Sequence, residues 1–286
     1  MNQSRRKFIR NAGAAAGGAA LFSQLPLYLL GSDKSTPKSF GFQVWTIRKE
    51  LVSDFPGTLK KMADWGYKEV EMCSPLGYSN AGFEPLNHMS GKEMKTIIED
   101  SGLKCTSSHF NMGELRESLG NRMEWAHGLG MKQMVASSFW LPKDASVDDY
   151  RKSCDELNKL GEKTKANGLQ MVFHNHHMEF EKRGDELIYD EMLKVLDPDL
   201  VKMQFQVAVV DIGYKAEDYF SKYPNRFISA HLADYCPKEE KQVPIGKGMV
   251  DWKELFKSGK KAGIKNYYVE MDPVTFEPSA DYLASL

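Results

Sequence analysis

The sequence predicts an α/β protein with a single (β/α)8 barrel, a TIM barrel, over residues 38–286. Eight short apolar runs alternate there with longer amphipathic segments, which is the pattern of β–α–β units in a parallel sheet. Glycines repeatedly end the amphipathic segments just before the next apolar run. No linker-like stretch divides the eight units, and a length of 286 residues is usual for one barrel.

The apolar runs define the expected strands, at 40–46, 69–74, 104–110, 133–139, 169–176, 201–207, 228–235 and 267–272. The amphipathic segments define the expected helices, at 54–65, 91–101, 114–129, 147–167, 185–196, 216–222 and 252–262. A shortened eighth helix is expected at 279–286, after Pro278.

Local signals support several of these boundaries. Ser90 stands three residues before Glu93, the spacing of a capping box at a helix start. Ser146 precedes Asp148 and Asp149 in a first turn, where the helix dipole favours carboxylates. Glycines are expected in left-handed conformation at the helix ends: Gly66, Gly102, Gly130, Gly168 and Gly263. An open doubly wound sheet is the alternative, but it usually has a glycine-rich phosphate turn after its first strand, and Thr46-Ile47-Arg48 stands there instead.

The first thirty residues differ from the rest. Paired arginines, Arg5 and Arg6, precede an Ala/Gly-rich apolar stretch at 12–30, and this arrangement predicts a twin-arginine export signal over residues 1–32. Glycines and Pro26 interrupt the stretch, which makes it a poor spanning helix, although a membrane anchor is the alternative. We therefore expect a periplasmic protein with no stable membrane insertion after processing.

The amino-acid composition and net charge limit the classes of binding partner that we expect. Hydrophobic residues make up 42% and charged residues 27%, as in ordinary globular proteins, and the formal net charge is −1. This balance does not favour nucleic acid as a partner. The four cysteines, Cys73, Cys105, Cys154 and Cys236, have no metal-clip spacing and are expected to be buried small hydrophobic residues.

The active site of such a barrel is expected at the carboxyl ends of its strands. Polar side chains gather at those predicted ends, and five of the seven histidines are among them: His109, His174, His176, His177 and His231. His174 and His176 share one face of their strand because side chains alternate. Two imidazoles beside a carboxylate suit a divalent transition metal, although hydrogen-bonded polar layers at the barrel mouth would use the same residue types.

In this order, five phrases resemble the xylose isomerase-like barrel superfamily, which includes sugar isomerases and epimerases. They are WGYKEVE at 65–71, HNHHMEF at 174–180, YPNRF at 223–227, HLAD at 231–234 and PIGKGMVDW at 244–252. The resemblance covers nearly all of the chain from Phe40 onward.

The resemblance implies one divalent metal (Mn, Co, Zn or Mg), held in relatives by Glu, Asp, His and Glu on strands five to eight. Carried onto this sequence, those positions fall on His174, Gln206, His231 and Glu270. Gln206 replaces an anion by a neutral amide, a poor ligand for a transition metal, so relative to the family pattern the metal site is weakened, shifted or lost. His176 or Glu179 are candidates for the missing donor.

The resemblance also implies proton transfer at the carbon next to a carbonyl, which needs a base and an electrophile that stabilises the developing charge. The candidate catalytic residues are Glu179, His176, Glu270 and His109. The candidates for binding substrate are Trp45, Glu71, Lys247 and Trp140, and a buried structural role for Glu71 is an equal alternative.

The expected substrate is a small carbohydrate, a neutral sugar or keto-sugar, since sugar phosphates are cytoplasmic. Lyase or dehydratase action on a 3-keto-glycoside would use the same carbanion chemistry. A non-catalytic carbohydrate-binding barrel and a DNA-repair nuclease are further alternatives, and the near-zero net charge disfavours the nuclease. A homo-oligomer is compatible with the sequence.

Overall fold

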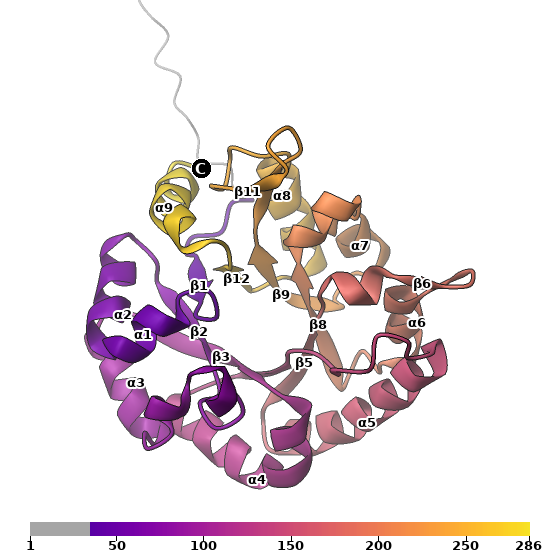
Figure 1. The fold of residues 1–286 in the computed structure, drawn as a ribbon, viewed down its shortest axis with the longest axis horizontal. Coiled ribbons are helices and arrows are strands. Elements are labelled where there is room, and N and C mark those ends of the chain that lie inside the picture. Colours follow the sequence, from indigo (N-terminus) through magenta and orange to yellow (C-terminus); the bar gives the residue numbers. More distant parts are fainter. Residues whose placement is uncertain (1–34) are drawn as a thin grey trace, which may run out of the picture. The chain divides into compact units, whose positions relative to one another are not determined.

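Eight parallel strands close into a barrel in the computed structural model, which describes residues 35–286 (Figure 1). The barrel strands are β1 (Gly41–Gln43), β2 (Glu69–Cys73), β3 (Lys104–Phe110), β4 (Gln133–Ala136), β5 (Gln170–His174), β8 (Val201–Gln206), β9 (Phe227–Leu232) and β12 (Asn266–Val269). Their order around the barrel is β1-β12-β9-β8-β5-β4-β3-β2. Gly41 of β1 pairs with Glu69 of β2 and with Tyr268 of β12, which closes the ring. The predicted (β/α)8 barrel is confirmed.

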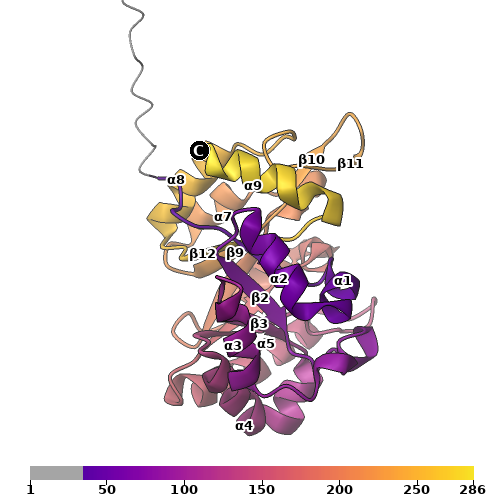
Figure 2. The same cartoon turned by 90° about the vertical axis from the view of Figure 1, so that its left-hand side faces the viewer.

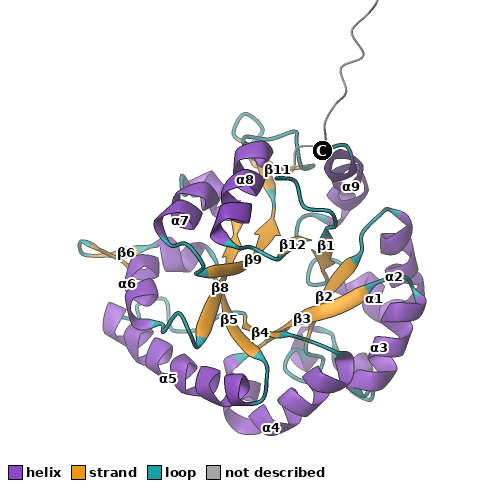
Figure 3. Cartoon of the chain, turned by 180° about the vertical axis from the view of Figure 1, so that it is seen from behind, coloured by secondary structure: helices purple, strands orange, loops and turns teal. Residues whose placement is uncertain are grey.

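Helices form the outer layer around the strands (Figures 1 and 3). They are α1 (Arg48–Ser53), α2 (Phe55–Asp64), α3 (Gly91–Asp100), α4 (Met112–Leu129), α5 (Val147–Ala166), α6 (Ile188–Val195), α7 (Ala216–Lys222), α8 (Trp252–Ala262) and α9 (Phe276–Ala284). The side view in Figure 2 places the hairpin of β10 (Asp234–Cys236) and β11 (Lys241–Val243) near α9. The predicted export signal, residues 1–32, lies outside the described residues.

The expected helix boundaries have clear physical causes. Ser90 and Glu93 form the predicted capping box of α3, and Ser146 forms another with Asp149 at the start of α5. At the end of α4, Gly130 has φ 86°, a conformation that a side chain with Cβ rarely adopts. The other glycines predicted to be left-handed also have positive φ: Gly66, Gly102, Gly168 and Gly263.

Several sequence-based expectations for the helices were wrong. Helix α1 was not predicted, because its six residues are too few to show a helical period. Helix α6 begins at Ile188 rather than 185, since 186–187 pair with 182–183 in a small hairpin, β6 (Lys182–Arg183) and β7 (Glu186–Leu187). Helix α9 begins at Phe276, before Pro278, because proline is tolerated in a first helical turn.

Alternation along the strands separates an apolar layer from a polar interior. Phe205 of β8 faces the helices, where its ring lies 6.1 Å from Tyr189 and 5.5 Å from Tyr219. Its neighbours Gln204 and Gln206 face the barrel axis and are buried. The hydrophobic core therefore lies between strands and helices, and the barrel interior is left to hydrogen-bonded polar groups.

The cysteine prediction is largely confirmed. All four cysteines are free, and Cys73, Cys105 and Cys154 are buried, whereas Cys236 is half-buried in the β10–β11 hairpin. Within residues 35–286, no helix is both long and apolar enough to cross a membrane.

Candidate active site at the barrel mouth

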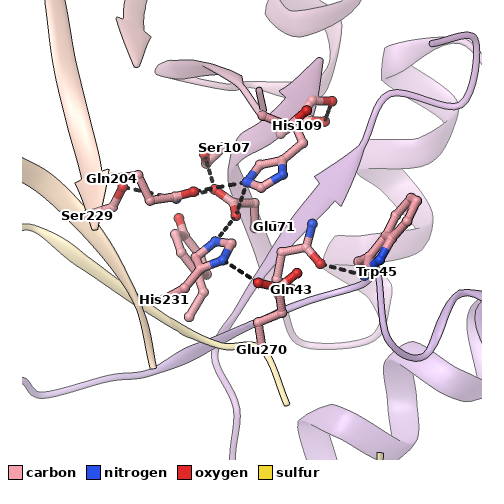
Figure 4. A network of polar contacts seen from close by, with 12 residues as sticks. Gln43, Trp45, Glu71, Ser107, His109, Gln204, Ser229, His231 and Glu270 are labelled. Carbon is pink, nitrogen blue, oxygen red and sulfur yellow. Dashed lines mark hydrogen bonds and ion pairs between the residues drawn. The ribbon is translucent and has the colours of Figure 1, made fainter. Parts of the chain in front are cut away.

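The carboxylate of Glu71 is the centre of a polar network inside the barrel (Figure 4). Its Oε1 accepts hydrogen bonds from Ser107 Oγ at 2.5 Å and from Gln204 Nε2 at 2.8 Å. Its Oε2 lies 2.5 Å from His231 Nε2 and 3.1 Å from His109 Nε2. Both oxygens are therefore fully engaged by protein groups, and the side chain is wholly buried.

The ionised form of Glu71 is favoured by its neighbours. Burial alone would raise the pKa of this carboxyl, but the rings of His109 and His231 and their hydrogen bonds hold it well below the usual range. Glu71 is thus a fixed negative charge beneath the barrel mouth.

His231 lies between two carboxylates. Its Nδ1 is 2.9 Å from Glu270 Oε2, while its Nε2 faces Glu71. Burial alone would lower the pKa of this imidazole, but the two carboxylates raise it to about 9. A carboxylate can only accept, so both ring nitrogens carry hydrogen in this arrangement.

Three histidine rings from three strands meet above Glu71. The rings of His109 and His231 are stacked with centroids 5.2 Å apart, and the ring of His174 lies 4.4 Å from that of His231. One nitrogen of each ring lies within 4.8 Å of the other two, a cluster that could hold a metal ion. We call His109, His174 and His231 the histidine cluster.

His174 differs from its two partners in the cluster. It is 1% exposed, and neither ring nitrogen has a hydrogen-bond partner among the described residues. Burial, followed by the charges of His231 and His176, lowers the pKa of its ring well below the usual value. A neutral imidazole with free nitrogens is the form in which histidine binds a metal.

Glu270 and Gln206 form the edge of the network. Gln206 Nε2 donates to Glu270 Oε2 at 2.8 Å, and Gln206 Oε1 accepts from the backbone N–H of Ala208 at 3.2 Å. The pKa of Glu270 is lowered: burial raises it, but the charge and hydrogen bond of His231 outweigh burial. The amide of Gln206 thus orients a carboxylate, and its oxygen is already in use.

His176 and Glu179 diverge just beyond β5. The ring of His176 lies 4.8 Å from that of His174 and is partly exposed at the mouth. Glu179 is wholly buried, accepts from the backbone N–H of His176 at 2.7 Å, and has a carboxyl pKa raised to about 8 by burial. Its charge acts on Tyr150 and Tyr189 of the helical layer, away from the histidine cluster.

The chain matches the family model of the xylose isomerase-like TIM barrel over residues 59–285. The chain belongs to this family.

Curated relatives of this xylose isomerase-like barrel are inosose dehydratases. One from Lacticaseibacillus casei is 24% identical over 229 residues, which cover 65% of this chain and 76% of the relative. Another, from Clostridium perfringens, is 25% identical over 152 residues, covering 46% of this chain. The chain spans only about half the length of that second relative, at 50%.

Solved structures give the same architecture. A sugar phosphate isomerase/epimerase from Parabacteroides distasonis is 27% identical with a TM-score of 0.73, and the match covers 89% of this chain and 98% of that one. A 3-keto-D-glucoside 4-epimerase from E. coli has a TM-score of 0.59 over 87% and 99% of the two chains. At 17% identity the second likeness shows the fold alone.

The structure brings several sequence-predicted residues of the xylose isomerase-like barrel together, namely His109, His174, His176, Gln206, His231, Glu270 and Glu71. It places others apart. Glu179 faces the helices, and Lys247 is exposed in the loop between β11 and α8. Glu71 has no oxygen free for a substrate hydroxyl, so the geometry favours the structural alternative for it.

The two candidate tryptophans lie at the rim of the barrel. The backbone N–H of Trp45 donates to Gln43 Oε1 at 2.5 Å, beside Glu270 in Figure 4. Trp140 is 58% exposed, and its ring lies 6.3 Å from that of His176.

Sequence reasoning missed the residues that hold the network from below. Ser107, Gln204 and Ser229 were not among the candidates, yet Gln204 joins Glu71, His109 and Ser229. Strand alternation was the available signal, because each residue stands two positions before an inward-facing candidate on its strand.

Proposed function

We propose that the chain is a metal-assisted sugar isomerase or epimerase that removes the proton on the carbon next to a carbonyl of a neutral sugar or keto-sugar. The observation that carries the proposal is His174, a buried imidazole with both nitrogens unpartnered, inside a cluster of three histidines flanked by two carboxylates. A buried polar group without a hydrogen-bond partner destabilises the folded state, and a bound ligand such as a metal ion would supply the missing partner for His174.

The donor set fits a divalent transition metal. His109, His174 and His231 would hold the ion with Glu270 as the adjacent carboxylate, and His231 would give up one of its two ring protons as the ion binds. Imidazoles favour Mn, Co or Zn over Mg, which prefers oxygen. Such an ion supplies positive charge that stabilises an enediolate. The amide of Gln206 would not be a ligand in this arrangement, because its nitrogen donates to Glu270.

Other side chains of the chain position the reacting groups. Glu71 and Gln204 fix the orientation of the rings of His109 and His231, as hydrogen-bond partners of metal ligands commonly do. His176 is the partly exposed histidine next to the cluster, so it is placed to move a proton at the substrate carbon. Glu270 is the alternative base, since its partly exposed carboxylate lies 2.9 Å from Nδ1 of His231.

Metal analysis followed by NMR tests this proposal. The purified protein should hold stoichiometric Mn, Co or Zn, and it should introduce solvent deuterium into a keto-sugar next to its carbonyl. His176→Gln should lose the exchange and keep the metal, whereas His177→Gln, at the exposed histidine paired with Asp211, should keep both. Absence of both metal and exchange would leave the carbohydrate-binding barrel as the function.

A lyase is the second candidate, favoured by the match to inosose dehydratases. The same carbanion would then expel a hydroxyl or glycosidic oxygen from the neighbouring carbon. An alkene signal and loss of the sugar in the same NMR experiment would identify elimination. Epimerisation would instead give a second sugar with deuterium at one carbon.

We also propose that residues 1–32 direct export to the periplasm by the twin-arginine route. The support is the arginine pair before an apolar stretch. Replacing both Arg5 and Arg6 by lysine should leave the protein in the cytoplasm, and normal export of that variant would contradict the assignment.

A further inference from the structure

A groove of about 500 Å³ opens at the barrel mouth beside the histidine cluster. Its lining comes from the loops after β1, β2 and β4 and from the start of α4. Four of its lining residues are aromatic: Trp45, Tyr78, Phe139 and Trp140. The volume is within the range of small-molecule sites, and aromatic walls with a few polar groups are typical of them.

The groove adjoins the proposed reaction centre without containing it. None of the three cluster histidines lines it. Trp140 contacts His176 at one side, and His176 lies against His174. Trp45, on the other side, is tied through its backbone to Gln43, which lies beside Glu270 in Figure 4. A sugar ring at the cluster would therefore leave the groove open to whatever is attached to it.

The backbone of Trp140 has an unusual conformation, and its side chain is exposed. Its φ is 52°, in the left-handed region that large side chains rarely adopt, and its N–H donates to Ser138 Oγ at 3.1 Å. The side chain gains little burial from this strain, since it is 58% exposed. Strained residues that persist without a packing benefit cluster at ligand sites.

The polar groups of the groove are few. Asn111 uses its side chain to cap α4 and to bond Gly77, so it has little left for a ligand. Arg116 gives two N–H groups to Glu156, at 2.7 Å each, and its Nη1 is free of that pair. Recognition in the groove would thus rest on ring stacking, with Arg116 and the exposed Asn80 available to hydroxyl groups.

We propose that this groove is the subsite for the second ring of a glycoside whose keto-sugar ring lies at the histidine cluster. The inference rests on the proposed function for the position of the first ring. A pyranose presents a face of C–H bonds that packs on an indole, which accounts for an exposed tryptophan at this place. The substrate class is then a disaccharide or similar glycoside rather than a free monosaccharide.

Binding measurements test the subsite without turnover. In titration calorimetry with the metal-loaded protein, cellobiose should bind about 10-fold more tightly than methyl β-D-glucoside, which corresponds to a contribution of about 1.4 kcal/mol from one stacked ring. Trp140→Ala should abolish that difference, and Trp140→Phe should retain most of it. Met249→Ala, at an exposed apolar residue of the mouth outside the groove, should leave the ratio unchanged.

The outcomes separate the two proposals. If cellobiose binds no more tightly than methyl β-D-glucoside, or if Trp140→Ala keeps the difference while melting at the wild-type temperature, the subsite is wrong. If the difference depends on Trp140 but no deuterium exchange occurs with any keto-sugar, the subsite stands and the enzymatic proposal fails.

Discussion

The Nε2 atom of His231 lies 2.5 Å from Oε2 of Glu71, although β12 and β1 separate their two strands in the barrel. The contact crosses the interior, and the other nitrogen of the same ring reaches Glu270. Glu71 also accepts from His109. One buried carboxylate therefore fixes two of the three rings of the histidine cluster.

His174 is held differently from these two rings. Among the described residues, neither of its nitrogens has a hydrogen bond of normal geometry, and only a weaker interaction with the amide of Gln204 adds to the packing that sets its position. The cluster thus combines two oriented rings with one uncommitted ring, and the uncommitted ring gives the cleanest test of metal binding.

His174→Ala should lower the affinity for Mn or Zn by more than about 100-fold, since changing even an indirect partner of a metal ligand costs 10–100-fold. The unfolding free energy without metal should fall by about 2 kcal/mol, because removing this buried ring leaves a cavity, although no hydrogen bond is lost. Titration calorimetry and chemical denaturation with chelator measure the two effects. His177→Ala is the matched control, and equal affinity in both variants would exclude His174 as a ligand.

Gln206→Glu keeps the length of the side chain and replaces the donor to Glu270 by a second carboxylate. Without metal, the like charges should raise the pKa of Glu270 and reduce the free energy of unfolding by about 1–3 kcal/mol. With a divalent ion the added charge is favourable, so metal affinity should rise. Gln242→Glu adds the same charge in β11 as a control. Unchanged affinity in Gln206→Glu would place the metal away from Glu270.

The fold could be predicted because its signals are local. Eight apolar runs, capping residues such as Ser90 and glycines such as Gly130 each report on a few neighbouring residues, and the barrel follows from their order. The strands were expected to continue past their true ends, for instance to 139 where β4 ends at Ala136. Apolar composition continues into the loop there, but the strand pairing does not.

The candidate site was predicted only in part, since pairing across the barrel is not visible in a sequence. Histidines at strand ends indicated the place, but the partner of each could not be read. Gln206 illustrates this: as a counterpart of an acidic ligand it was expected at the metal, yet its amide is bonded to Glu270. Glu179, three residues after His176, was expected at the mouth and faces the helices.

Glu114 makes the stability of the barrel depend on pH. Its carboxyl accepts from Ser74 Oγ at 2.7 Å and from the N–H of Asn111 at 3.1 Å, but burial raises its pKa to about 7 from a reference value of 4.5. The folded state then holds the proton more tightly than the unfolded state. The contribution of the protonated Glu114 to the free energy of unfolding is fully present below pH 4.5. It is lost as the pH rises through about 7, and the total loss is about 3 kcal/mol.

Glu114→Gln should remove this pH dependence, because it deletes the titrating group. Its unfolding free energy should be lower at every pH, since an amide cannot accept at both positions. Urea denaturation at pH 5, 6 and 8 measures the slope, and Glu117→Gln, exposed on the same helix, should retain the wild-type slope. A wild-type slope in Glu114→Gln would assign the titration to another group.

Asp234 should prove to be the residue that holds the loop between β11 and α8. Its buried carboxylate accepts from the N–H groups of Gly246, Gly248 and Val250, at 2.9, 3.0 and 3.2 Å, and from Trp252 Nε1 at 3.0 Å. In Asp234→Asn, the side-chain NH2 group would face N–H donors that it cannot accept from. We therefore expect the unfolding free energy to fall by about 3 kcal/mol. Hydrogen exchange should show the amides of the three loop residues losing protection while the barrel strands keep theirs. Asp281→Asn, exposed on α9, is the control for lost charge. Protection retained at all three amides would mean that the loop is held by its own packing instead.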